Sequence, residues 1–234
     1  MCGRYASSLA SAAIARLFHT VNPLPNAAPC WNIAPSQTPL IVRRDPASGA
    51  RHLVKMRWGL MPIWMKEPKR AQINARAETV ATAPFFRAAF SARRCLVPAE
   101  AFYEWGQGAA GGAGGKVPYA IARRDGEPMA LAGIWEPPRR ESEGSGEATE
   151  ATFAIITTEA NATLSAIHGR MPVILGDADW PLWLGEIKGA DAKALLRPAK
   201  DDLLRAWPVG RRVNSPAHDG PDLLDAMGEA GSPA

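Results

Sequence analysis

The amino terminus carries the first group that could do chemistry. Cys2 directly follows Met1, so removal of Met1 would put an α-amine and a thiol on one residue. Their reference pKa values, about 8 and about 8.5, let both groups react at physiological pH. Such an aminothiol condenses with an aldehyde to a five-membered thiazolidine, and intramolecular ring closure favours the product. With an amide or ester it would instead be an N-terminal nucleophile, and a cysteine without a role is the third interpretation.

Two further side chains have the chemistry of proton transfer. Glu104 stands among large aromatic residues, which would exclude water and raise the pKa of its carboxyl toward useful acid–base values. His168 stands where a predicted helix gives way to an apolar run, and histidine exchanges protons near neutral pH. A structural carboxylate paired with an arginine, and a structural histidine, remain open alternatives.

Polar side chains of three types alternate in the stretch from residue 74 to residue 78. Asn74, Arg76 and Glu78 would share one face of an extended strand and could orient a polar substrate. A solvated edge strand is the alternative. Arg4, close to Cys2, is a cation suited to phosphate, or else a partner in a surface salt bridge.

Aromatic and basic residues suggest a polyanionic partner. Most of the eight tryptophans should lie in the core, whereas Trp64 and Trp105 are expected to be functional, since exposed rings stack on bases. The net charge of +4 divides into 17 basic and 5 acidic residues in 1–124, against 10 basic and 18 acidic residues in 125–234. This division indicates either a polyanion-binding face or only the base composition of the genome.

The elements that must position these residues are short. Many brief strand-like runs and few short helices, without regular alternation, predict one α+β domain around a curved sheet. We expect this domain to span residues 1–214, with flexible loops at 106–115 and 137–150 and a disordered acidic tail at 215–234. The predicted helices cover residues 9–18, 84–92, 161–167, 179–184, 191–196 and 201–206.

Several classes of protein are excluded. No run approaches the roughly 18 apolar residues of a membrane span, and no signal sequence is visible. Three cysteines without CxxC spacing exclude a disulfide framework and argue against a zinc site. We therefore expect a cytoplasmic protein without metal or cofactor.

Taken together, the motifs resemble those of the SOS response-associated peptidase family, also known as abasic-site processing proteins. They occur in the family's order and extend from residue 1 to about residue 214. The matching stretches are Met1–Tyr5, Trp31–Pro35, Trp58–Leu60, Asn74–Glu78, Cys95–Trp105, His168–Pro172 and Pro208–Val209.

The resemblance implies a barrel-like mixed sheet and a monomeric sensor of abasic sites in single-stranded DNA that associates with the nucleoid when bound. In the family, the amino-terminal cysteine forms a thiazolidine crosslink with the open-chain sugar and shields the lesion from strand cleavage. The resemblance also implies autoproteolysis before the cysteine and lyase-type imine chemistry. A peptidase acting on proteins and a non-covalent DNA-binding module are the alternatives.

The resemblance assigns roles to individual residues. Asn74 would orient Cys2 and the sugar, Glu104 would transfer protons, and His168 would assist ring opening. The expected DNA-binding residues are the arginines that contact phosphates and four residues along the DNA path, namely Arg4, Arg76 and Arg170 with Asn32, Pro35, Trp64 and Trp105.

Overall fold

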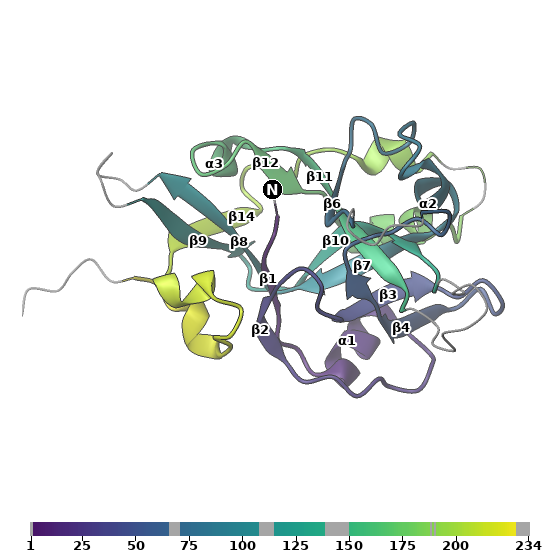
Figure 1. The fold of residues 1–234 in the computed structure, drawn as a ribbon, viewed down its shortest axis with the longest axis horizontal. Helices are drawn as coiled ribbons and strands as arrows, with labels where there is room; N and C mark the ends of the chain where they lie inside the picture. Colours follow the sequence, from purple (N-terminus) through teal and green to yellow (C-terminus); the bar gives the residue numbers. More distant parts are fainter. Residues whose placement is uncertain are drawn as a thin grey trace, which may run out of the picture.

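Two sheets make up most of the fold (Figure 1). The computed structural model describes residues 2–65, 71–107, 115–138, 150–187, 189 and 191–227. Sheet A has the order β14-β9-β8-β1-β2. Its strands are β1 (Tyr5–Ser7), β2 (Cys30–Ile33), β8 (Ala101–Gln107), β9 (Lys116–Arg123) and β14 (Leu204–Pro208).

Sheet B is larger and mixed. Its main order is β12-β11-β10-β7-β3-β4, with β13 beside β10 and with β5 and β6 parallel to β11. Its strands are β3 (Leu40–Arg44), β4 (Arg51–Lys55), β5 (Arg57–Trp58), β6 (Asn74–Arg76), β7 (Arg94–Ala99), β10 (Met129–Glu136), β11 (Thr152–Glu159), β12 (Arg170–Pro172) and β13 (Ile174–Leu175).

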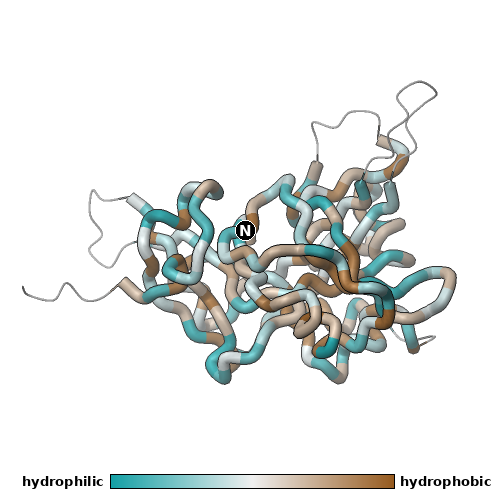
Figure 2. The backbone as a smooth tube through the Cα atoms, turned by 90° about the horizontal axis from the view of Figure 1, so that it is seen from below, coloured by the Kyte–Doolittle hydropathy of each residue, from teal (hydrophilic) through white to brown (hydrophobic). Residues whose placement is uncertain are grey.

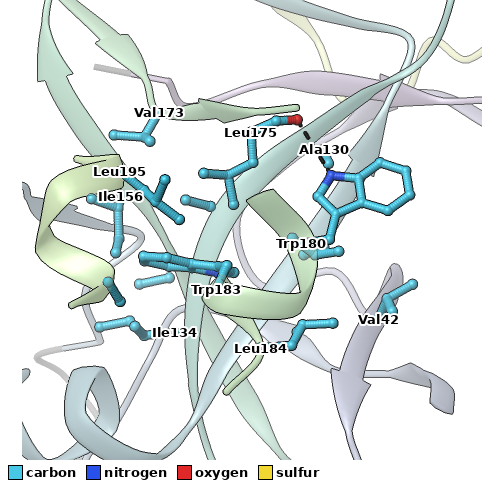
Figure 3. Close-up of a cluster of buried hydrophobic side chains, with 14 of the residues drawn as sticks. Val42, Ala130, Ile134, Ile156, Val173, Leu175, Trp180, Trp183, Leu184 and Leu195 are labelled. Carbon is cyan, nitrogen blue, oxygen red and sulfur yellow. Dashed lines mark hydrogen bonds between the residues drawn. The ribbon is translucent and has the colours of Figure 1, made fainter. Parts of the chain in front are cut away.

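Short helices pack against the sheets. One hydrophobic cluster joins sheet B to α1 (Ser11–Phe18), α2 (Arg87–Ala92), α4 (Trp180–Trp183) and the 3₁₀ helix η3 (Ala192–Leu195). Trp180 and Trp183 lie within this cluster (Figure 3), and their indole N–H groups donate to Leu175 O at 3.3 Å and Cys95 O at 2.9 Å. Buried indoles need such partners, so α4 is fixed by both packing and hydrogen bonds. The other short helices are α3 (Ala162–Ser165), η2 (Asp177–Asp179), η4 (Arg211–Asn214) and η5 (Pro221–Leu224).

Alternation along the strands of sheet A divides the molecule into layers. Phe102 packs into the core between the sheets, while Ala101 and Tyr103 pack on the opposite, outer face. The outer face is covered by the carboxyl-terminal segment, through Val213 and Leu223. Figure 2 colours the chain by hydropathy and shows that apolar and polar residues follow one another at short intervals along much of the tube.

The prediction of an α+β fold with a curved mixed sheet and short helices is confirmed. The helix predicted at residues 201–206 is wrong, because Leu204–Pro208 forms strand β14 beside β9. Leu204 and Ala206 face the inter-sheet core at a spacing of two, and Asp201 accepts a hydrogen bond from the Ala162 N–H instead of starting a helix.

The expectation of a disordered tail from residue 215 is wrong for residues 215–227. Leu223 is only 2% exposed, because it completes the cluster on the outer face of sheet A. Asp219 accepts a hydrogen bond from the Trp31 N–H at 2.6 Å, and the Met227 N–H donates to Pro208 O at 2.9 Å. The remaining tail, and most of the expected loops at 106–115 and 137–150, lie outside the described residues.

The three thiols Cys2, Cys30 and Cys95 are free. In the described ranges, no cluster of three or more histidine, cysteine or acidic residues could hold a metal ion. No helix of the described chain has the length and apolar character needed to cross a bilayer.

Candidate active site between the sheets

The amino-terminal segment runs to the middle of the molecule, and the marker N stands between the groups of strands in both views (Figures 1 and 2). The Cys2 side chain is fully buried in the inter-sheet core. Asn74 pairs with Ile155 of β11, a residue of the same core, so its side chain faces Cys2. The Asn74 Nδ2 donates to the Cys2 carbonyl oxygen at 2.9 Å. This bond fixes the backbone of the residue expected to react.

The side-chain oxygen of Asn74 can accept a further hydrogen bond. Asn74 Oδ1 is buried and has no hydrogen-bond partner among the described residues. A buried acceptor without a partner costs stability. It can therefore gain from a donor supplied by a bound ligand or by the amine of Cys2.

Glu104 reaches the site through the alternation of β8. It lies opposite Tyr119, which packs on the inter-sheet core, and it is only 3% exposed. Burial raises the pKa of its carboxyl, and the nearby charge of His168 acts in the opposite direction. The sequence-based expectation of a desolvated carboxyl is confirmed. A carboxyl with a raised pKa exchanges protons closer to neutral pH.

Gly106 lets His168 come close to Glu104. A side-chain Cβ at Gly106 would lie 3.2 Å from Ile167 Cα, nearer than such atoms normally approach. The glycine thus allows the end of α3 to pack directly on β8, two residues beyond Glu104. Sequence reasoning missed Gly106, although a glycine directly after the aromatic stretch was the available signal.

His168 is oriented by the backbone of Arg170. Its Nδ1 lies 3.0 Å from the Arg170 nitrogen and 3.1 Å from the Arg170 carbonyl oxygen. In the neutral ring, Nδ1 accepts from the N–H, which assigns the proton to Nε2; in the charged ring, Nδ1 donates to the carbonyl. Both protonation states therefore find a partner, as proton transfer by this ring requires.

The thiol of Cys2 is held in its neutral form. Burial raises the pKa of the Cys2 thiol, and the Glu104 carboxylate raises it further. A buried thiol beside a carboxyl group can pass its proton to that group as it attacks an electrophile. We call Cys2, Asn74, Glu104 and His168 the inter-sheet site.

Arg76 and Arg170 lie at the end of this site but differ in their contacts. Arg76 is exposed and belongs to β6 with Asn74, as the spacing of two predicts. Glu78 lies in the turn after β6 instead, and its carboxylate forms a two-pronged ion pair with Arg170 at 2.5 and 3.0 Å. The Arg170 guanidinium also donates to Thr157 O at 2.6 Å. The hydrogen bonds from Arg170 lower the pKa of Glu78, so this pair stays ionised at neutral pH.

Three of the expected DNA-binding residues lie on the other face of sheet A. Arg4 Nη1 donates to Asn32 Oδ1 at 2.8 Å and to Val213 O at 2.7 Å, and its guanidinium lies 5.9 Å from the centre of the Trp105 ring. Asn32 Nδ2 donates to Ser215 O at 3.0 Å and to His218 O at 2.8 Å. We call Arg4, Asn32, Trp105 and the bound segment 213–218 the outer clamp.

The outer clamp separates residues that are close in sequence. Cys2 and Glu104 face the inter-sheet core, whereas Arg4 and Trp105 face the carboxyl-terminal segment. Arg4 is partly buried, and this burial lowers the pKa of its guanidinium. The structure therefore does not place the Arg4 guanidinium beside the Cys2 thiol.

The remaining expected residues lie at the surface or in a turn. Trp64 is 60% exposed and touches Phe85 edge-on, with ring centres 6.4 Å apart. Pro35 precedes Ser36, which has a φ of +72° and donates its N–H to Trp58 O at 2.8 Å. The indoles Trp58, Trp135, Trp180 and Trp183 are buried, so Trp64 stands out as an exposed ring.

The Cys2 thiol is thus fully buried between two sheets, with the Glu104 carboxyl close enough to raise its pKa. The sequence matches the SOS response associated peptidase (SRAP) family over residues 1–216, and the chain belongs to this family.

Several proteins that are similar in sequence are named for abasic sites. The abasic site processing protein YoqW of Bacillus subtilis is 36% identical over 97% of this chain and 100% of its own length. YoaM of the same organism, with the same description, is 38% identical over 85% of both chains. The abasic site processing protein HMCES of Gallus gallus is 35% identical over 78% of this chain and 60% of its own length.

Solved structures share the fold. A protein from Bacteroides thetaiotaomicron superposes with a TM-score of 0.82 at 24% identity, covering 97% of this chain and 100% of its own. A protein from Bordetella bronchiseptica gives a TM-score of 0.73 at 27% identity, covering 89% of this chain and 100% of its own. The two-sheet fold is thus common to these proteins.

Proposed function

We propose that this protein senses abasic sites in single-stranded DNA and captures them covalently through Cys2. The observation that carries the proposal is the burial of Cys2 in the inter-sheet site, with its backbone bonded to Asn74 and its thiol within the influence of Glu104. The names of the relatives, which refer to abasic sites, support the choice of substrate.

The reaction needs no external reagent. After loss of Met1, the Cys2 amine adds to the aldehyde carbon of the open-chain sugar, and loss of one water gives an imine. The thiol sulfur then bonds to the imine carbon, while the thiol proton reaches the nitrogen, and a thiazolidine forms. The crosslinked sugar no longer has a free aldehyde, so the elimination that cuts the strand is blocked.

The inter-sheet site supplies the proton transfers. His168 assists the opening of the closed sugar, since its Nδ1 has a backbone partner in either protonation state. Glu104 donates to the departing water and receives the thiol proton. The raised pKa of the thiol makes the amine the first nucleophile and the thiol the second.

The exposed residues near the site would hold the DNA strand. Arg76 is available for a phosphate, and Trp64 can stack on a base. Arg170 is held in place by its ion pair with Glu78. Pro35 shapes the turn after β2, and in this proposal Arg4, Asn32 and Trp105 act by holding the carboxyl-terminal segment.

Crosslinking can be measured with a single-stranded abasic-site oligonucleotide and denaturing electrophoresis. Protein lacking Met1 should give a heat-stable shifted band, and Cys2→Ala should reduce its amount at least ~100-fold. Cys30→Ala, which removes a half-buried thiol elsewhere, is the matched control and should crosslink like wild type. Because Cys2→Ala keeps its amine, borohydride should restore a crosslink by trapping the imine.

The same experiment separates the alternatives. A peptidase acting on proteins would cleave a peptide library and give no DNA band. A non-covalent DNA-binding module would bind reversibly with a steep dependence on salt. Absence of a covalent adduct from wild-type protein that lacks Met1 would rule out the proposed chemistry.

A further inference from the structure

An open cleft of about 480 Å³ lies beyond the inter-sheet site. It is bounded by the turn after β6, the end of β11, and the segment from η3 to residue 198. Its polar lining comprises two hydroxyls and four charged side chains, namely Thr82, Thr158, Glu78, Glu159, Lys193 and Arg197.

The strand β6 connects this cleft to Cys2. Asn74, at its start, bonds the Cys2 carbonyl, and Glu78, two residues beyond its end, lines the cleft. Arg76 stands between them and pairs with Thr157, the neighbour of the lining residue Thr158. Two residues of a strand span about 6.6 Å. The chain from Asn74 through Arg76 to Glu78 therefore forms a short path from Cys2 to the cleft.

The charges along this path favour an anion. Arg76, Lys193 and Arg197 are exposed, and within the described ranges none of them forms an ion pair. Glu78 is already neutralised by Arg170 at 2.5 Å, which leaves Glu159 as the opposing charge in the lining. Four cations thus face two carboxylates, and the surplus of positive charge lies on the path that leads away from Cys2.

We propose that this cleft is a phosphate-binding subsite for the single strand that flanks the lesion, with Lys193 and Arg197 as its phosphate ligands. The inference rests on the proposed function, because it takes its ligand to be the strand whose lesion reaches Cys2. Arg76 contacts the phosphate between the lesion and the cleft. An open, hydroxyl-lined cleft with two flexible cations suits a phosphodiester, which needs charge and hydrogen bonds but no deep apolar pocket.

The test measures non-covalent binding to unmodified single-stranded oligonucleotides by fluorescence anisotropy across a salt series. For a strand of roughly 20 nucleotides, the double variant Lys193→Gln/Arg197→Gln should bind about tenfold more weakly at low salt. Its plot of log affinity against log salt should be shallower by about 1.4, which corresponds to two lost phosphate contacts on single-stranded DNA.

The matched control is Arg16→Gln/Lys55→Gln, which removes the same charge from α1 and β4, far from the marker N in Figure 1. It should leave the salt slope within experimental error. Equal slopes for the two double variants, or an unchanged slope for Lys193→Gln/Arg197→Gln, would overturn the subsite. Because fluorescence anisotropy measures binding without any covalent step, the result for the subsite does not depend on whether the wild-type protein crosslinks to abasic DNA.

Discussion

The two faces of sheet A use neighbouring residues for opposite purposes. On the inner face, Cys2 and Glu104 are buried where the pKa of each is raised. On the outer face, Arg4 and Trp105 belong to the outer clamp and hold the carboxyl-terminal segment by hydrogen bonds and ring contacts. Because successive side chains of a strand point to opposite faces, the adjacent residues Glu104 and Trp105 of β8 face the Cys2 thiol and the carboxyl-terminal segment, respectively.

This contrast shows that a motif need not act as one unit. Glu104 and Trp105 are adjacent, yet only Glu104 faces the thiol. A substitution on the inner face should therefore change reactivity, and one on the outer face should change stability. The variants below test this division.

The largest effect is expected for Glu104→Gln, which keeps the shape of the side chain and removes its acid–base function. Crosslinking should slow by about 100-fold, as for loss of a general acid–base group, while DNA affinity should stay within about threefold. Trp105→Phe, the adjacent outer residue, is the matched control and should crosslink at nearly the wild-type rate. Equal losses of crosslinking and of DNA binding in Glu104→Gln would indicate a structural role.

An intermediate effect, on stability, is expected for Asn32→Ala. Asn32 accepts from Arg4 and donates to Ser215 and His218 at 2.8–3.0 Å. At about 1 kcal/mol for each bond, the free energy of unfolding should fall by about 3 kcal/mol, which lowers Tm by roughly 6–12 °C. Thermal denaturation measures this change. Crosslinking well below Tm should persist, and its loss without any change of Tm would assign Asn32 to DNA contact.

The smallest effect concerns pH. The pKa of Glu104 is raised by burial, so the folded protein binds more protons than the unfolded chain above the ordinary carboxyl pKa of about 4.3. The stability that the protonated Glu104 carboxyl contributes is therefore fully present below that pH. It is lost as pH rises through the pKa that this carboxyl has in the folded protein. The Tm of Glu104→Gln minus that of wild type should grow from pH 4 toward pH 8. A constant difference across this range would contradict a raised pKa.

Much of the inter-sheet site could be predicted from sequence because its signals are local. The aromatic neighbours of Glu104 predict burial, and the spacing of Asn74 and Arg76 predicts their shared face. Glu78 departs from that face because the chain turns after Arg76 and the carboxylate meets Arg170 from a distant strand. Such a contact depends on the pairing of β6 and β12 with β11, which no local pattern encodes.

The outer clamp could not be predicted for the same reason. Arg4 and Asn32 have the side chains of phosphate- and base-binding residues. Only the fold shows that backbone carbonyls near residue 215 accept hydrogen bonds from them. Residues 215–227 have the polar composition of a tail, and two adjacent apolar residues, Leu223 and Leu224, anchor them to the outer face of sheet A. For residues 201–206 the sequence predicts a helix, whereas Leu204–Pro208 forms a strand because it pairs with β9.

The bond from Arg4 to Val213 joins residues 209 positions apart in the chain. During synthesis, the amino-terminal residues must therefore wait for almost the whole described chain to leave the ribosome before this bond can form. Contacts of such long range slow folding. The Cys2 end of the protein is made first and the outer clamp is completed last, so a chain interrupted before residue 213 has the Cys2 thiol but lacks the clamp.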